Sequence, residues 1–174
     1  FYTLARLVVA LLVIVGLPAV VCAQAKGRDT VGSLIQRLNH RNVEVRLRAI
    51  ETLGRLKDAR AIGPLLGVLK RDTLYSAREK IVMALNQIGP PAMEALITSL
   101  DSHDQRFRHD VSWTLGKMLP LSHEPLVAAL AHESDLVRRG AIRALGRGKD
   151  VAAVDPLLTA LDDGNALVRA EAAE

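Results

Sequence analysis

The sequence predicts an all-α protein, an α-solenoid made of stacked helical hairpins. Five arginines recur at steps of 32, 30, 30 and 31 residues, and several apolar columns keep the same phase around them. A fixed period of about 31 residues is typical of stacked copies of one supersecondary unit. The five arginines are Arg46, Arg78, Arg108, Arg138 and Arg169.

Each arginine lies on the second helix of its unit. Small or apolar residues stand one residue before it and three and seven residues after it, which is the spacing of one face of an amphipathic helix. Four residues before the arginine, four units carry a side chain that can cap a helix: Asn42, Asp104, Ser134 and Asn165. Leu74 breaks this column, and we expect Asp72 or Thr73 to cap that helix instead.

A first helix precedes each of these second helices. Its marker is a leucine column with a second leucine four residues later in every unit: Leu34, Leu65, Leu96, Leu126 and Leu157. Pro64, Pro125 and Pro156 stand near its start, where a missing backbone donor is tolerated. Gly54, Gly116 and Gly146 recur near the end of the second helix. Each unit is therefore predicted to be a hairpin of two helices.

Residues 45–54 and 153–161 show the repeat most clearly, and both segments resemble the HEAT-like repeats first noted in phycobilin lyases. The resemblance covers about residues 30–174. It implies a right-handed α-solenoid of HEAT-like hairpins. It does not single out one function, because such repeats serve scaffolds, adaptors, lyases and hydroxylases.

The first residues of the chain have a different composition. Residues 1–23 form a predicted hydrophobic leader in which Arg6 precedes an apolar run, and residues 24–174 form the repeat array. Small residues after this run favour a cleaved secretory signal, and hence an exported protein, periplasmic or extracellular. The alternatives are a membrane anchor and a lipoprotein attached through Cys22, the only cysteine. The sequence ends inside a predicted helix, so we expect the array to be truncated there.

Composition argues against a nucleic-acid partner. The chain carries 23 basic and 19 acidic residues, and the basic residues are spread among the acidic ones. Aromatic residues make up 3 % of the sequence. Nucleic-acid binding usually needs a clustered basic stripe, and single strands need stacking aromatics.

The search for catalytic chemistry finds no enzyme motif. Histidine precedes a carboxylate at His109, His123 and His132, but only His109-Asp110 falls where a hydroxylase built of similar repeats would hold a metal. A metal needs three or four converging ligands, and this pattern does not supply them. We predict no catalytic, cofactor-binding or metal-binding residue; a chromophore lyase-like or metal-dependent hydroxylase-like protein is the alternative.

The arginine column is predicted to be a structural ladder. Each arginine lies in the first turn of its helix, where the helix dipole disfavours a cation, so a compensating partner is needed. We expect bonds to carbonyls and carboxylates in the turn of a neighbouring repeat. The candidate carboxylates are Asp72, Asp104, Asp135, Asp162 and Asp163. The alternative is a line of cations that binds an anionic partner.

A partner-binding site is predicted on the concave side of the solenoid, which the second helices line. Met83 and Trp113 are apolar residues at equivalent positions, and they should lie side by side. The polar residues expected around them are Lys80, Asp110, Lys117, Arg143 and Arg147. The alternative is that Trp113 folds over its own repeat. The sequence thus predicts a non-catalytic, exported scaffold that binds a protein or peptide in its groove.

Overall fold

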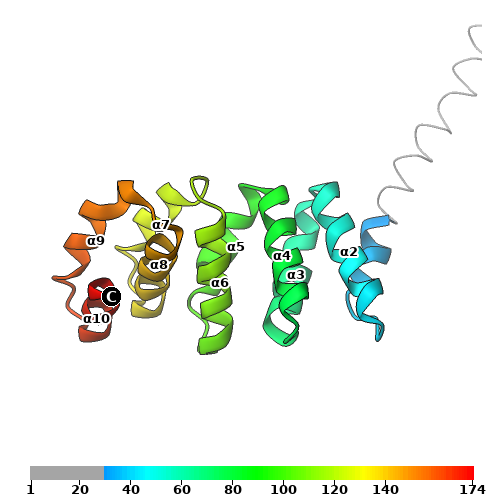
Figure 1. The fold of residues 1–174 in the computed structure, drawn as a ribbon, viewed down its shortest axis with the longest axis horizontal. Helices are drawn as coiled ribbons and strands as arrows, with labels where there is room; N and C mark the ends of the chain where they lie inside the picture. Colours follow the sequence, from blue (N-terminus) through cyan, green and yellow to red (C-terminus); the bar gives the residue numbers. More distant parts are fainter. Residues whose placement is uncertain (1–29) are drawn as a thin grey trace, which may run out of the picture.

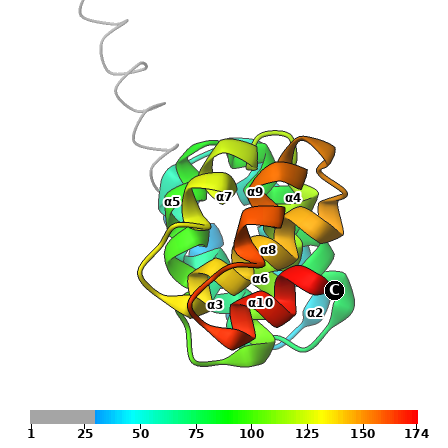
Figure 2. The same ribbon diagram turned by 90° about the vertical axis from the view of Figure 1, so that its left-hand side faces the viewer.

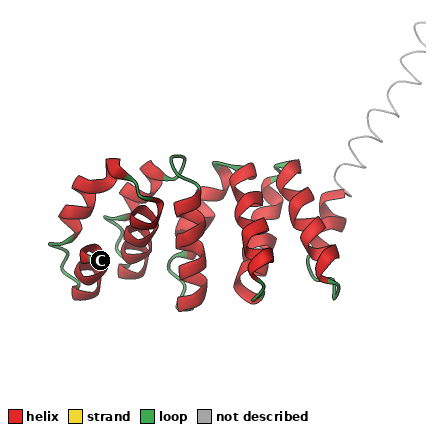
Figure 3. Cartoon of the chain, in the orientation of Figure 1, coloured by secondary structure: helices red, strands yellow, loops and turns green. Residues whose placement is uncertain are grey.

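The computed structural model describes residues 30–174, which form a stack of helical hairpins (Figure 1). Helices and loops make up this part of the chain, and it contains no strand (Figure 3). The predicted leader, residues 1–23, lies outside the described residues. No helix within residues 30–174 has the length and apolar character needed to cross a membrane.

The hairpins place their helices in two layers. The second helices form one layer: α2 (Val43–Leu56), α4 (Tyr75–Ile88), α6 (Gln105–Lys117), α8 (Asp135–Gly148) and α10 (Ala166–Ala173). The first helices form the other layer: residues 30–37, α3 (Ile62–Arg71), α5 (Pro91–Ser99), α7 (His123–Ala129) and α9 (Val154–Ala160). Figure 2 shows the same stack turned so that its C-terminal repeat faces the viewer. The predicted α-solenoid is confirmed.

Helix caps follow the predicted column in part. The side chains of Asn42, Asp104 and Asn165 accept hydrogen bonds from early amides of α2, α6 and α10. Ser134 makes no such bond, so its predicted cap is wrong: its hydroxyl donates to Asp101 in the preceding repeat at 2.5 Å. Leu74 precedes α4 and provides no side-chain cap, and Asp72 accepts a hydrogen bond from the Leu74 amide.

The core lies between the layers and consists of the predicted apolar columns. Leu53, Leu85, Leu115 and Leu145, at the same position of successive second helices, are fully buried. Leu65, Leu96 and Leu126 from the first helices are buried against them. Removing this apolar surface from water supplies the main stabilisation of the stack.

The second helices are not evenly packed. α2 lies against α4, and α6 against α8, along most of their lengths, whereas α4 and α6 touch at few points. At the two close junctions a glycine meets an alanine: a Cβ built on Gly54 would lie 2.6 Å from the Ala84 Cα, and one on Gly116 would lie 2.9 Å from the Ala144 carbonyl oxygen. The equivalent pair between α4 and α6 is Asn86 and Thr114. The close glycine–alanine contact is therefore absent from this junction.

Two connections between repeats share one geometry. α2 and α8 end at Lys57 and Lys149, which adopt left-handed backbone with φ of 52° and 54°. The following Asp58 and Asp150 cap the short 3-10 helices η1 (Ala59–Ala61) and η2 (Val151–Ala153). Each 3-10 helix leads directly into the first helix of the next repeat, α3 or α9.

Candidate functional site

The second-helix face, formed by α2, α4, α6, α8 and α10, carries the predicted partner-binding residues. Along this face, the residue five positions after one repeat arginine corresponds to the residue two positions after the next. We call the two residues a cross-repeat pair. The four pairs are Glu51 with Lys80, Met83 with Asp110, Trp113 with Gly140, and Arg143 with Glu171.

The two outer cross-repeat pairs are ion pairs. The Lys80 ammonium group bonds to the Glu51 carboxylate between α2 and α4. Arg143 makes a bidentate contact with Glu171 between α8 and α10, with nitrogen–oxygen distances of 2.9 and 2.5 Å. Lys80 and Arg143 are therefore already bound to carboxylates at the two ends of the face.

The two central cross-repeat pairs contain no ion pair. Met83 is 61 % exposed, and Trp113 is half-buried. The position opposite Trp113 is Gly140, which has no side chain to cover the indole. Apolar surface is thus presented where the pattern of ion pairs is interrupted.

Asp110 was predicted in the exposed rim, and this prediction is wrong. Asp110 is 4 % exposed, with its carboxylate 3.4 Å from the Arg78 Nε and 3.8 Å from the Arg106 Nε. A side chain two residues after a repeat arginine points to the preceding repeat. Gly140 occupies this position in α8, and a Cβ built on it would lie 2.6 Å from the Leu100 side chain of the preceding repeat. Because its cross-repeat partner Met83 carries no charge, Asp110 finds its counter-charge in Arg78 and Arg106 instead.

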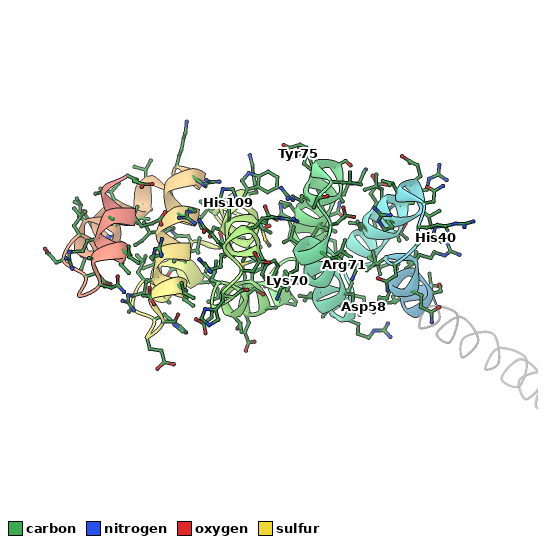
Figure 4. The ribbon with its side chains drawn as sticks, turned by 90° about the horizontal axis from the view of Figure 1, so that it is seen from below. His40, Asp58, Lys70, Arg71, Tyr75 and His109 are labelled. Carbon is green, nitrogen blue, oxygen red and sulfur yellow. The ribbon has the colours of Figure 1, made fainter. Side chains whose placement is uncertain are left out.

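Trp113 reaches the preceding repeat, and it does not share a depression with Met83. Its ring packs against Tyr75 of the preceding repeat, with centroids 6.4 Å apart and planes at 45°. Lys117 places its ammonium 6.0 Å from the indole centroid, within the range of a cation–π contact. In Figure 4, Tyr75 and Asp58 lie on opposite sides of the stack. The wide α4–α6 junction is thus bridged by an aromatic pair.

Met83 and Trp113 line two separate shallow depressions. One lies between α2 and α4 and is lined by Met83 with Glu51, Arg55, Lys80, Ala84 and Gln87. The other lies between α6 and α8 and is lined by Trp113 with Gly116, Lys117, Arg147 and Gly148. Both lie over a glycine–alanine junction. Only the first contains a carboxylate.

The charged side chains that line the depression at Trp113 are both cations, Lys117 and Arg147. Partial burial lowers the pKa of His109, and the nearby charges of Arg147 and Arg143 lower it further, against the opposing effect of Asp110. Lys117 and Arg147 are exposed and take part in no ion pair within residues 30–174.

The repeat arginines bind mainly the turn of their own repeat, which corrects the expectation that they reach carbonyls of a neighbouring one. Arg46, Arg108, Arg138 and Arg169 each donate to the carbonyl oxygen six residues earlier, at 3.0, 2.5, 2.8 and 2.7 Å. A side chain in the first turn of a helix points towards its N-terminus, and the hairpin turn lies there. Each arginine thus holds the turn between its two helices.

Carboxylates in the hairpin turn of the next repeat add contacts at two of the arginines. Arg46 pairs with Asp72 at 3.1 Å, and Arg138 pairs in bidentate fashion with Asp163 at 2.7 and 3.0 Å. Within residues 30–174, no ion pair joins a repeat arginine to Asp104, Asp135 or Asp162. Arg46 and Arg138 are less than one-fifth exposed, so they do not form a free line of cations.

Arg78 departs from the column. The carbonyl six residues before it belongs to Asp72, and that oxygen accepts from Arg106 at 2.6 Å. Arg78 turns instead to Asp110 across the wide α4–α6 junction. The side chains of Arg78, Asp110 and Ser112 each leave one buried polar atom without a hydrogen bond inside the described region.

The histidine–carboxylate dipeptides lie apart. His109 Nδ1 is 3.9 Å from Asp110 Oδ1, and residues 30–174 contain no group of three or more His, Cys, Asp or Glu side chains arranged to hold a metal. His123 bonds instead across the repeat boundary, with its Nδ1 2.5 Å from the Asp150 Oδ2.

The His123–Asp150 contact should make stability depend on pH. The hydrogen bond to Asp150 raises the pKa of His123 above its ordinary value of about 6.5. At a pH below that ordinary value, protonated His123 stabilises the folded state by the full amount. This stabilisation is lost as the pH rises through the folded-state pKa. His123→Gln should therefore lower the melting temperature more at pH 5.5 than at pH 9. An equal loss at both pH values would contradict the assignment.

Sequence reasoning missed Tyr75 and the cross-repeat pairs. Tyr75 precedes the arginine of its repeat by three residues, and no apolar column marks that position. The pairs could have been found by aligning the fifth residue after one arginine with the second after the next. That alignment exposes the change from charged to apolar at Met83 and Trp113.

Comparison with known proteins places the chain among repeat proteins. The family described as HEAT repeats matches residues 31–116 and 123–174. A designed armadillo repeat protein is similar in structure, at 18 % identity and a TM-score of 0.34 over 80 % of this chain and 78 % of that one. Human deoxyhypusine hydroxylase in complex with glycerol is similar at 20 % identity and a TM-score of 0.40, with 82 % of each chain covered. Among curated proteins, none matches significantly.

Proposed function

Because this chain belongs to the HEAT-repeat family, we propose that it is a protein-binding scaffold that uses its second-helix face and carries out no catalysis of its own. The observation that carries this proposal is the break in the cross-repeat ion pairs at Met83 and Trp113. At the two outer cross-repeat pairs, an ion pair joins the neighbouring second helices. At Met83 and Trp113 the chain leaves apolar side chains open to a partner.

The energetics of protein interfaces support this site. Tryptophan is over-represented among the residues that dominate binding energy, and such anchors are usually central with charged residues around them. Trp113 lies near the middle of the stack, between the ion pairs of Lys80 and Arg143. Its indole is held in place by Tyr75, which lowers the entropy lost when a partner binds.

Export is part of the proposal and rests on residues 1–23 alone. A basic residue, an apolar run and a small-residue exit are the features of a secretory signal. The partner is then a protein outside the cytoplasm.

Position-specific crosslinking tests the function. A photoreactive residue at Met83, in protein recovered from its own host, should crosslink to a discrete protein partner, and the product should disappear when Trp113→Ala is added. The matched control is the same photoreactive residue at Glu94, an exposed position of α5 in the other layer. Equal crosslinking at both positions, or at neither, would contradict the proposal. Sequencing the N-terminus of the same sample shows whether the leader was removed.

A further inference from the structure

The depression around Trp113 differs in charge from the rest of the second-helix face. Its two flanking cations, Lys117 and Arg147, have no carboxylate partner in the described region, and no acidic side chain lines the depression. The cations of the outer cross-repeat pairs, Lys80 and Arg143, are bound to Glu51 and Glu171. Arg48 and Arg55 on α2 are also exposed without an ion pair in residues 30–174, but Arg55 shares its depression with Glu51, whereas the depression at Trp113 has two cations and no carboxylate.

An apolar anchor lies between these charges. Part of the indole of Trp113 is open to solvent, and Gly116 and Gly148 form a floor without side chains beside it. Both glycines are required by packing: a Cβ on Gly116 would lie 2.9 Å from the Ala144 carbonyl oxygen, and one on Gly148 would lie 2.1 Å from the Leu119 side chain. A partner side chain can therefore approach the backbone of α6 and α8 closely.

From this juxtaposition we propose that the depression between α6 and α8 binds an acidic peptide segment. An apolar side chain of the segment stacks on Trp113, and neighbouring Asp or Glu carboxylates bind Lys117 and Arg147. The inference rests on the proposed scaffold function and adds the chemical class of the partner.

A peptide fits this surface better than a nucleic-acid strand. Lys117 and Arg147 form one short cluster, whereas a phosphate backbone running along the face would meet the carboxylates of Glu51 and Glu171. Trp113 and Tyr75 already pack against each other, so they do not offer a series of free stacking platforms.

Titration with a defined peptide tests the inference. The probe is a short tryptophan-free peptide in which aspartates and glutamates flank a leucine–phenylalanine pair. Because Trp113 is the only tryptophan in the chain, its emission reports binding directly. The double variant Lys117→Ala/Arg147→Ala should bind about tenfold more weakly, since each exposed charge contributes modestly to affinity. Both side chains are exposed, so the variant should fold normally.

The matched control is Arg48→Ala/Arg55→Ala, which removes two exposed cations from α2 on the same face and changes the net charge equally. It should bind the peptide like the unmodified chain. Equal loss in both double variants would reduce the effect to general electrostatics and overturn the site. Absence of binding, equal binding of an Asn/Gln version of the peptide, or tighter binding of a single-stranded oligonucleotide would also overturn it. If Met83 still crosslinks to a protein while the peptide fails, the scaffold function stands and only the acidic partner is wrong.

Discussion

Gly54→Ala should lower the free energy of unfolding by about 1–3 kcal/mol, the usual cost of forcing an extra methyl group into a packed interior. The new Cβ would lie 2.6 Å from the Ala84 Cα, and a backbone atom cannot move aside without shifting α4. The helix propensity of alanine offsets only part of this cost, about 1 kcal/mol at most.

The same substitution at Gly67 should have the opposite sign. Gly67 is an exposed residue of α3, and a Cβ there would meet only the Arg71 side chain, at 4.0 Å. Gly67→Ala should therefore raise the free energy of unfolding, by up to about 1 kcal/mol, through helix propensity alone. Urea unfolding of both variants measures the difference. Equal effects would show that the glycine column does not set the distance between α2 and α4.

Asp110→Ala should destabilise the chain by about 3 kcal/mol, the lower end of the cost of breaking a buried ion pair. The carboxylate is almost fully buried and lies within 4 Å of the Nε atoms of both Arg78 and Arg106. Its removal leaves two cations facing each other across the α4–α6 junction with no counter-charge. We expect the lower end of the range because the Arg78 side chain is partly exposed.

A double variant separates this effect from loss of packing. Arg78→Met/Asp110→Leu removes both charges while keeping side-chain volume, and buried ion pairs replaced in this way are often neutral in stability. It should recover most of the loss seen for Asp110→Ala in urea unfolding. If the double variant is as unstable as the single one, the uncompensated charge is not the cause.

The repeat architecture could be predicted from the sequence because the signal is repeated. Any one leucine at Leu85 or Leu115 is ambiguous, but the same leucine in four successive units specifies which helix face is buried. The caps were predictable at Asn42, Asp104 and Asn165 for the same reason: a short polar side chain before a helix has one dominant use.

The details of the site were less predictable because they depend on contacts between repeats. The position of Asp110 looks exposed when its helix is considered alone, but it points to the preceding repeat once the hairpins stack. Met83 and Trp113 were singled out correctly as apolar residues on an outward face. Their assignment to separate depressions goes with the wide α4–α6 junction, where Asn86 and Thr114 stand in place of the glycine and alanine of the close junctions.

The central claim is that partners dock on the second-helix face around Trp113. Amide chemical shifts of the labelled chain, recorded during titration with the acidic peptide, test it most directly. The account predicts shifts concentrated in α6 and α8 near Trp113, Lys117 and Arg147. Shifts concentrated instead in α5 and α7, or in the hairpin turns held by Arg108 and Arg138, would contradict it.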